Sequence, residues 1–414
     1  MKENRVVVTG LGMIAAVGND VPACWEALKA GKSGIGPITA FDVSRFDSRI
    51  AGEVKGFDPL IYGLNTKDIK RMDKFSQYAV ACSMQAIKDS GLDLSKVNRE
   101  RFGVIIGSGI GSLHTVEVEH NIYLEKGPSR MSPFLIPMLI VNAASGQVAI
   151  HLGLKGPNSA VATACASGSH AIGDAFKVIE RGDADMMMTG GTESCIVPTA
   201  VGGFCALKGL STRNNEPQRA SRPFDKERDG FVIAEGCGMV VLENLEHAKK
   251  RGAKIYGEIT GYGMSCDAYH MTAPEPTGDG ATRAMNQAIK DANINPEDIG
   301  YINAHGTSTK LNDKIETGSI KKSLGAHAKK VIISSTKSMT GHPLGAAGGI
   351  EFAVCCLVLR DGVIPPTINY EHPDPDCDLD YCPNSARKHA VEVCLSNSLG
   401  FGGHNATLIV QKLK

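Results

Sequence analysis

The chain has 414 residues, of which 42% are hydrophobic, and this is enough to bury a large core and to form two or three domains. Its 44 basic and 44 acidic residues cancel, so no global charge favours a nucleic acid or a membrane surface as a partner. The sequence begins without a signal-peptide pattern, which predicts a cytoplasmic protein. The 12 cysteines lack paired spacing, so we expect free thiols and no structural metal site.

The first predicted strand, residues 5–13, ends in glycines that imitate a nucleotide-binding motif. Gly10, Gly12 and Ala15 fit the pattern G-x-G-x-x-A. A dinucleotide site requires a helix that opens directly on those glycines. Here the first helical pattern begins only at Val21, after another loop. A nicotinamide-dependent oxidoreductase is therefore an alternative of a different class, and we expect no cofactor of this kind to bind.

Residues 131–154 form a long stretch without Asp, Glu, Lys or Arg. Prolines and polar residues interrupt it, among them Pro133, Pro137 and Gln147. Such interruptions are unfavourable in a membrane-spanning helix. We therefore expect this stretch to contribute to the core and to an interface, and no membrane partner is predicted.

Cys165 lies where a short apolar strand, Ala160 to Ala164, passes into a helix. Apolar residues recur after it at helical spacing, and Gly182 marks the end: Ile172, Ala175, Phe176 and Ile179. The free N–H groups and positive dipole end of a helix N-terminus favour a thiolate. A cysteine among small residues is also often just a buried apolar side chain. Both interpretations, nucleophile and core residue, remain open at this point.

The second half of the chain echoes the first. Residues 258–264 (Glu-Ile-Thr-Gly-Tyr-Gly-Met) resemble residues 7–13 (Val-Val-Thr-Gly-Leu-Gly-Met), and the strand–turn–helix of 165–181 recurs at 331–360. Strands that alternate with helices indicate an α/β protein with buried sheets. The echo indicates an internal duplication, with predicted halves 1–255, which carries the cysteine, and 256–414.

Two histidines in the second half also follow predicted strands. His305 ends the segment Ile302-Asn-Ala-His, and His342 follows Lys337 in Lys-Ser-Met-Thr-Gly-His. In α/β proteins, ligands bind beyond the carboxyl ends of the strands, so we expect Cys165 and both histidines to share one site. Lys337 and Glu351 are expected to orient the His342 imidazole, although an ordinary salt bridge would explain them equally well.

These motifs together resemble the β-ketoacyl-[acyl-carrier-protein] synthases of thiolase fold, and among them the type II elongation enzymes of bacterial fatty acid synthesis. The resemblance rests on four segments and covers essentially the whole chain: residues 163–167, 303–309, 337–342 and 397–403. It implies a homodimer and an acyltransferase without a cofactor. It also implies two βαβαβαββ halves stacked as five αβαβα layers.

The chemistry that the resemblance implies begins with transfer of an acyl chain from acyl carrier protein to Cys165. Malonyl-carrier protein then loses carbon dioxide, and the resulting carbanion attacks the thioester to give a 3-oxoacyl chain two carbons longer. His305 and His342 are expected to donate to the malonyl thioester oxygen. The backbone N–H groups of Cys165 and Phe401 are expected to bind the oxyanion.

The resemblance assigns further residues by position. Ile110 and Phe401 are expected to gate the acyl pocket, and Lys337, Glu351 and Asp313 to support the site. A basic group is expected to meet the acidic carrier protein: Lys67, Lys70, Arg71 and Arg213. Some relatives bind a monovalent or magnesium ion near the asparagines and glutamate of the second-half motifs, but no metal ligand is assigned here.

Several alternatives share the fold. A type I synthase, a polyketide ketosynthase and a non-catalytic chain-length subunit all remain possible, although the last usually lacks the cysteine. A biosynthetic thiolase carries a second cysteine followed two residues later by glycine, and no cysteine after residue 260 has this spacing. An initiating synthase of the third type would have asparagine in place of His342.

Overall fold

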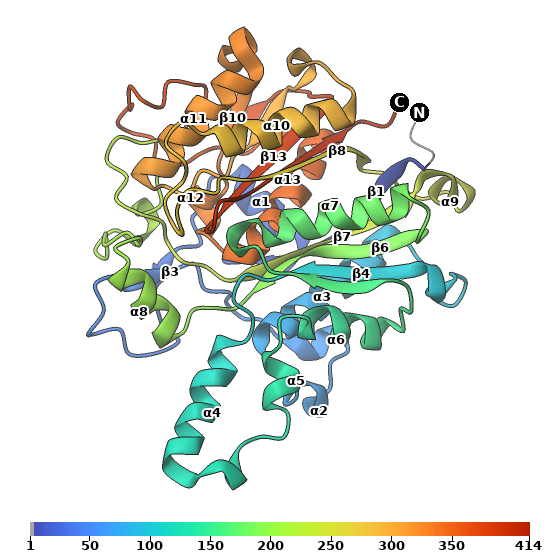
Figure 1. The fold of residues 1–414 in the computed structure, drawn as a ribbon, viewed down its shortest axis with the longest axis vertical. Helices are drawn as coiled ribbons and strands as arrows, with labels where there is room; N and C mark the ends of the chain where they lie inside the picture. The colour runs from blue at the N-terminus through green and yellow to red at the C-terminus, as the bar shows by residue number, and fades with distance from the viewer. Residues whose placement is uncertain (1–3) are drawn as a thin grey trace.

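The computed structural model describes residues 4–414 and is built on ten strands in the order β10-β9-β13-β14-β8-β1-β7-β6-β4-β5 (Figure 1). The strands of the first half are β1 (Val6–Ala15), β4 (Phe102–Gly107), β5 (Asn158–Val161), β6 (Met186–Glu193) and β7 (Gly236–Asn244). Those of the second half are β8 (Gly257–Cys266), β9 (Tyr301–Asn303), β10 (Ile332–Ser334), β13 (Val393–Gly400) and β14 (His404–Gln411). The halves join through a short antiparallel pairing of β1 with β8.

The two halves repeat one topology. Starting from the join, the strand order is β1-β7-β6-β4-β5 on one side and β8-β14-β13-β9-β10 on the other. The parallel pairs are β5 with β4 and β4 with β6 in the first half, and β10 with β9 and β9 with β13 in the second. The last two strands of each half along the chain, β6 with β7 and β13 with β14, pair antiparallel. The predicted duplication is confirmed. The boundary at residue 255, between β7 and β8, stays a prediction.

Helices separate and cover the two sheets, which gives the five predicted layers. α3 (Lys74–Ser90) and α6 (Ala143–Leu152) cover the outer face of the first half, and α10 (Asp279–Ala292) with α11 (Lys310–Leu324) covers that of the second. α7 (Ser167–Glu180) and α13 (Ala347–Asp361) lie between the sheets and contact each other.

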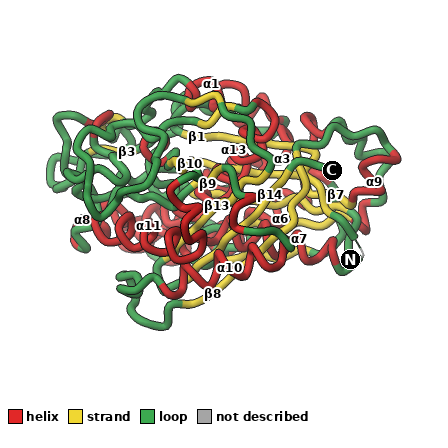
Figure 2. Tube along the Cα trace, turned by 90° about the horizontal axis from the view of Figure 1, so that it is seen from above, coloured by secondary structure: helices red, strands yellow, loops and turns green. Residues whose placement is uncertain are grey.

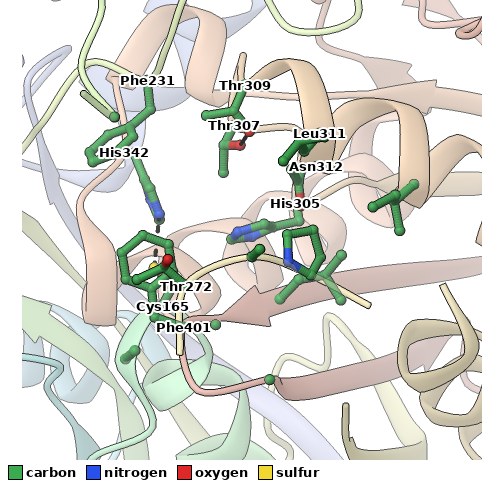
Figure 3. Close-up of a pocket in the computed structure, with 18 of the residues that line it drawn as sticks. Cys165, Phe231, Thr272, His305, Thr307, Thr309, Leu311, Asn312, His342 and Phe401 are labelled. Atoms are coloured by element: carbon green, nitrogen blue, oxygen red, sulfur yellow. Dashed lines mark hydrogen bonds between the residues drawn. The ribbon is translucent and has the colours of Figure 1, made fainter. Parts of the chain in front are cut away.

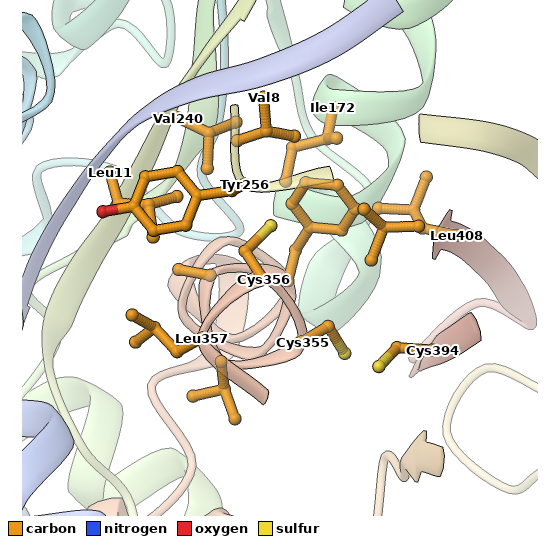
Figure 4. Packing of buried hydrophobic residues seen from close by; sticks show 14 of the residues in the cluster. Val8, Leu11, Ile172, Val240, Tyr256, Cys355, Cys356, Leu357, Cys394 and Leu408 are labelled. Carbon is orange, nitrogen blue, oxygen red and sulfur yellow. The ribbon is translucent and has the colours of Figure 1, made fainter. Parts of the chain in front are cut away.

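The central helix α13 is apolar on all sides because it has no solvent face. Every residue from Ala347 to Leu359 is buried, as expected for a helix enclosed by core. Figure 4 shows α13 end-on, with Val8 and Ile172 of the first half and Leu408 of the second packed around it. This helix thus joins the two halves into one core.

Shorter elements complete the chain. The remaining helices are α1 (Val21–Lys29), α2 (Thr66–Ile69), α4 (Leu113–Lys126), α5 (Leu135–Leu139), α8 (Pro198–Ala206), α9 (Leu245–Lys250) and α12 (Lys337–Thr340). The remaining strands are β2 (Gly36–Pro37), β3 (Ile50–Ala51), β11 (Val363–Ile364) and β12 (Arg387–Lys388). α4 and α5 project from the body (Figure 1), and loops gather near α8 and β3 at the end opposite the C-terminus (Figure 2). Within residues 4–414, no helix is long and apolar enough to cross a membrane.

The glycines of the apparent nucleotide motif have a packing role. Gly10 and Gly12 lie within β1, and α3 crosses directly over them. A Cβ atom on Gly12 would lie 1.9 Å from the carbonyl oxygen of Cys82, and one on Gly10 would lie 2.2 Å from that of Ala86. The glycines therefore allow close approach of a helix to the sheet, and the first helix after the motif begins only at Val21.

Gly12→Ala is expected to lower the free energy of unfolding by about 1–3 kcal/mol, because β1 and α3 must separate to admit the methyl group. Gly318→Ala is the matched control, since Gly318 lies in α11 and a Cβ atom there meets nothing within 4 Å. That control is expected to be neutral or stabilising by up to about 1 kcal/mol. Urea unfolding of both variants checks this, and equal stabilities would contradict it.

Candidate active site

A cavity of about 520 Å³ opens beyond the carboxyl ends of β5 and β9. Residues of both halves line it, including Cys165, His305, His342 and Phe401 (Figure 3). The two histidines and the cysteine are buried, and their ligand-type atoms lie within 4.8 Å of one another. The expectation that three distant segments form one site is therefore met in the geometry.

Cys165 lies in a tight turn between β5 and α7. The strand ends at Val161, before the predicted limit of Ala164, and Ala164 adopts a left-handed φ of 49°. The turn is closed by Ser167, whose Oγ accepts from the backbone N–H of Thr163 at 2.9 Å and donates to the carbonyl oxygen of Ala164 at 2.6 Å. Cys165 thus lies one turn before α7, as the sequence predicts.

The environment of the Cys165 thiol differs from the sequence-based expectation. Burial raises its pKa to about 12, although Lys337 and the backbone N–H groups of Phe401 and Cys165 act in the opposite direction. Desolvation therefore outweighs the helix N-terminus, and the buried side chain rests as a thiol. The Nε2 atom of His342 lies 3.1 Å from Sγ (Figure 3), which provides a base within hydrogen-bond distance.

His305 and His342 face each other across the cavity. Their ring centroids are 5.4 Å apart and the rings are nearly perpendicular, at 86°. Burial lowers the pKa of both histidines well below the usual value, and the charge of Lys337 acts in the same direction. Both rings are therefore neutral near pH 7, so each offers one N–H donor and one nitrogen acceptor.

Lys337 contacts His305 and not His342, and Glu351 contacts Lys337, which corrects the sequence-based expectation. Lys337 Nζ donates to the carbonyl oxygen of His305 at 2.7 Å and lies 3.5 Å from its Nδ1, and it forms a buried ion pair with Glu351. The reason is the turn at Gly341, which places His342 beside β-bridge residue Ile233. Burial raises the pKa of Glu351 to about 7, and Lys337 opposes this shift.

Backbone contacts orient the second-half loops. The backbone N–H of His305 donates to Glu316 Oε1 at 2.8 Å. Asp313 lies one helical turn earlier on α11, accepts from the backbone N–H of Phe224 at 2.8 Å and faces Arg228. Among the described residues, it forms no hydrogen bond to His305 or His342. Glu316 was missed from the sequence. Its spacing of three residues from Asp313, which puts both carboxylates on one buried helix face, would have been the signal.

The proposed carrier-protein residues do not form one group around the cavity. Lys67, Lys70 and Arg71 are exposed on and after α2, none of them lines the cavity, and Arg71 stacks over Phe134 with 4.6 Å from its Cζ to the ring centroid. Arg213 is half-buried and lies 3.8 Å from Asp229, which lines the cavity. Only Arg213 lies at the edge of the site.

Two groups of buried side chains have atoms of the types that coordinate metal ions. The Cys165, His305 and His342 atoms have the types that bind zinc, but the adjacent ammonium of Lys337 disfavours a cation. Behind them, Asn303 and Ser396 are neighbours across β9 and β13, and their side-chain oxygens, like Oε2 of Glu351, are buried without a hydrogen-bond partner among the described residues. Oxygens of this kind suit a hard cation, but the Lys337 ammonium paired with Glu351 disfavours one here as it does at the first group.

Comparisons with known proteins agree with this geometry. The family model "Beta-ketoacyl synthase, N-terminal domain" matches residues 3–248, and the model "Beta-ketoacyl synthase, C-terminal domain" matches residues 256–371. A 3-oxoacyl-[acyl-carrier-protein] synthase 2 of Synechocystis is 55% identical over 100% of this chain and 99% of its own length. The protein of that name from Coxiella burnetii is 52% identical over the full length of both.

A similar solved structure is a ketosynthase in complex with a type II polyketide acyl-carrier protein. It is 38% identical, with a TM-score of 0.92 over 99% of this chain and 100% of that chain. The thiolase fold inferred from the sequence is thereby confirmed.

Stability is expected to fall with acidification in part because of His170, which lies behind Cys165 and contacts Thr163 at 2.7 Å. Burial lowers its pKa to about 4, so its neutral form stabilises the fold above pH 6.5 and this contribution is lost as the pH falls toward 4. When the pH is lowered from 7.5 to 5.5, the free energy of unfolding should fall by about 1 kcal/mol more for wild type than for His170→Gln. Urea unfolding at both pH values measures this, and parallel losses would contradict it.

Proposed function

Because this chain belongs to the β-ketoacyl synthase family, we propose that it elongates acyl chains by two carbons, as a 3-oxoacyl-[acyl-carrier-protein] synthase does. Cys165 would carry the acyl chain as a thioester, and a malonyl thioester would supply the two carbons with release of carbon dioxide. The observation that carries the proposal is the meeting of one thiol and two neutral imidazoles in a buried cavity between the halves.

In the first half-reaction, Sγ of Cys165 attacks the acyl thioester carbonyl. The thiol must lose its proton, and His342 Nε2 at 3.1 Å is the acceptor. The same nitrogen then returns the proton to the leaving carrier thiolate, so the histidine ends neutral. The backbone N–H groups of Cys165 and Phe401, which already face the sulfur, are placed to bind the oxyanion.

In the second half-reaction, the bond between the malonyl α-carbon and its carboxylate breaks, and the electron pair enters an enolate. The facing rings of His305 and His342 can each donate an N–H to that enolate oxygen. The enolate carbon then attacks the Cys165 thioester, and the cysteine leaves as a thiolate that takes up one proton from water to restore the thiol. Lys337 supports this step by holding the His305 backbone through its 2.7 Å bond.

The comparisons favour fatty acid elongation over the alternatives. Full-length relatives named 3-oxoacyl-[acyl-carrier-protein] synthase 2 are 50–55% identical, whereas the polyketide ketosynthase is 38% identical. A non-catalytic subunit would need no nucleophile, but Cys165 is present with a base in contact. We therefore assign the type II elongation reaction.

Acyl carrier protein is the proposed partner, since a similar ketosynthase has been solved with its carrier protein. Arg213 at the cavity edge is best placed to meet an acidic carrier, and Lys67, Lys70 and Arg71 would contribute at a distance from the cavity. Cytoplasmic location stays a prediction.

A second copy of this chain is the other proposed partner. Large apolar side chains are exposed on and beside α4, α5 and α6: Val118, Tyr123, Leu124, Ile136, Ile140 and Ile150. Apolar patches of this kind mark protein interfaces. The projecting α4–α5 arm would be covered in a homodimer.

Sedimentation of the protein is expected to give twice the 43.8 kDa chain mass. Leu124→Glu, on α4, would put a charge in the buried interface and shift the protein toward monomer. The control is Leu311→Glu on α11, which changes an equally apolar residue of similar exposure at the cavity. It should leave the dimer intact. A monomeric wild type would refute the proposed interface.

Intact mass after incubation with long-chain acyl-carrier protein should show an acyl adduct on wild type and none on Cys165→Ala. His305→Ala should still take the acyl group but condense it roughly 10²–10³-fold more slowly, because one enolate donor is lost. His342→Ala should slow both half-reactions, since it also loses the base in contact with Sγ.

These variants separate the roles by the half-reaction that each one affects. If His342→Ala is acylated at the wild-type rate, His342 is not the base that accepts the thiol proton. Equal acylation of wild type and Cys165→Ala would remove the cysteine as the nucleophile and bring the non-catalytic alternative forward.

A further inference from the structure

Glu193, the last residue of β6, is a fully buried carboxylate with five hydrogen-bond donors. Oε1 accepts from Ser108 Oγ at 2.9 Å and from the backbone N–H groups of Ile110 and Gly111, both at 3.1 Å. Oε2 accepts from the backbone N–H groups of Gly109 at 2.7 Å and Gly345 at 3.0 Å. No lysine or arginine forms a salt bridge with it within the described part of the chain.

These donors come from two loops, and each loop donates to Glu193. Residues 108–111 follow β4, and residues 344–346 follow His342. A Cβ atom on Gly345 would lie 2.3 Å from the backbone nitrogen of Gly109 and 2.8 Å from Oε2 of Glu193. The loops are therefore in direct backbone contact, and within residues 4–414 the Glu193 carboxylate is the one side chain that accepts from N–H groups of both.

Both loops form the apolar wall beside the nucleophile. Ile110 and Leu344 line the same cavity as Cys165, and they belong with Phe204 to one apolar cluster that includes the cysteine. An acyl chain bound to Sγ has to lie against this wall, because the opposite side of the cavity presents the polar groups of His305 and His342. The position of the wall thus depends on one buried side chain.

We propose that Glu193 is a positioning residue that sets acyl-chain selectivity by holding the Ile110 and Leu344 loops together. This inference rests on the proposed acyl transfer to Cys165. Glu193 forms no hydrogen bond to the sulfur or to either histidine, and its charge, which raises the pKa of the Cys165 thiol, acts equally on every acyl substrate. A difference between chain lengths can therefore arise only through the wall.

A carboxylate suits this position because it accepts on both oxygens and donates nothing. All five partners donate, and the N–H group of Gly111 is shared with Ser108 Oγ at 3.1 Å. Glutamine at 193 would direct an NH₂ group at two or three N–H donors, so those bonds would be lost and the two loops would separate. Aliphatic contacts of Ile110 and Leu344 with a bound chain would change with that separation.

The test uses Glu193→Gln and compares acyl transfer to Cys165 across carrier-protein substrates from four to sixteen carbons, by intact mass against time. The ratio of kcat/KM between the best and worst chain length is expected to fall about tenfold, the scale of discrimination that a few methylene contacts provide. The KM for malonyl-carrier protein should not change, because the histidine side of the cavity is untouched.

Two further variants keep the test decisive. Ser108→Ala removes one of the five donors and should flatten the profile in the same direction by a smaller factor, even where Glu193→Gln folds poorly. In an Ile110→Ala background, Glu193→Gln should add little further change, since the residue through which it acts is already truncated.

Each outcome separates this inference from the proposed function. If wild type takes no acyl group, acyl transfer itself is refuted. If wild type is acylated but Glu193→Gln slows all chain lengths by one factor, the carboxylate is only a structural support and the inference is overturned. A full effect of Glu193→Gln in the Ile110→Ala background would also overturn it.

Discussion

Exclusion of water from the interface between the two halves determines the protonation states of the residues in the site. Burial alone accounts for the largest shift at Cys165, His305 and His342, and it moves each pKa toward the neutral form. A solvated version of this site would hold a partly ionised thiol and partly protonated histidines. Because the groups rest uncharged, a single proton moved between sulfur and nitrogen suffices for acyl transfer, and neutral N–H donors remain for the enolate.

That dry interface exists because the two sheets share their central helices. α7 follows the Cys165 turn and α13 follows the His342 segment, and each of them packs against strands of both halves. Buried charge is admitted only where it is paired or bonded: Lys337 with Glu351, and Glu193 with its five donors. Each of these charges holds a loop whose side chain faces the cavity.

The sequence pattern was sufficient to predict the duplication and the meeting of Cys165 with His305 and His342, because strand ends in an α/β fold converge whatever lies between them. The five layers followed only from the family resemblance. The pattern was insufficient to predict which histidine Lys337 contacts, because the turn at Gly341 places His342 beside Ile233. Nor did helix position predict the thiol's protonation, since burial depth is a property of the assembled halves. Glu193 carried no motif at all, because its partners are backbone groups that any sequence possesses.

The turns before the two central helices are geometrically alike. Residues 164–166 and 344–346 both form a single 3₁₀ turn, and each begins with a non-glycine residue in the left-handed region, Ala164 at 49° and Leu344 at 43°. Cys165 therefore has Gly345 as its counterpart, and the amide of the latter binds Glu193 in place of a substrate oxyanion. This geometry fits descent from a pair of identical half-length chains with two equal reaction centres. Of these two equivalent turns, one now carries the Cys165 sulfur and the other joins the Glu193 hydrogen bonds beside it.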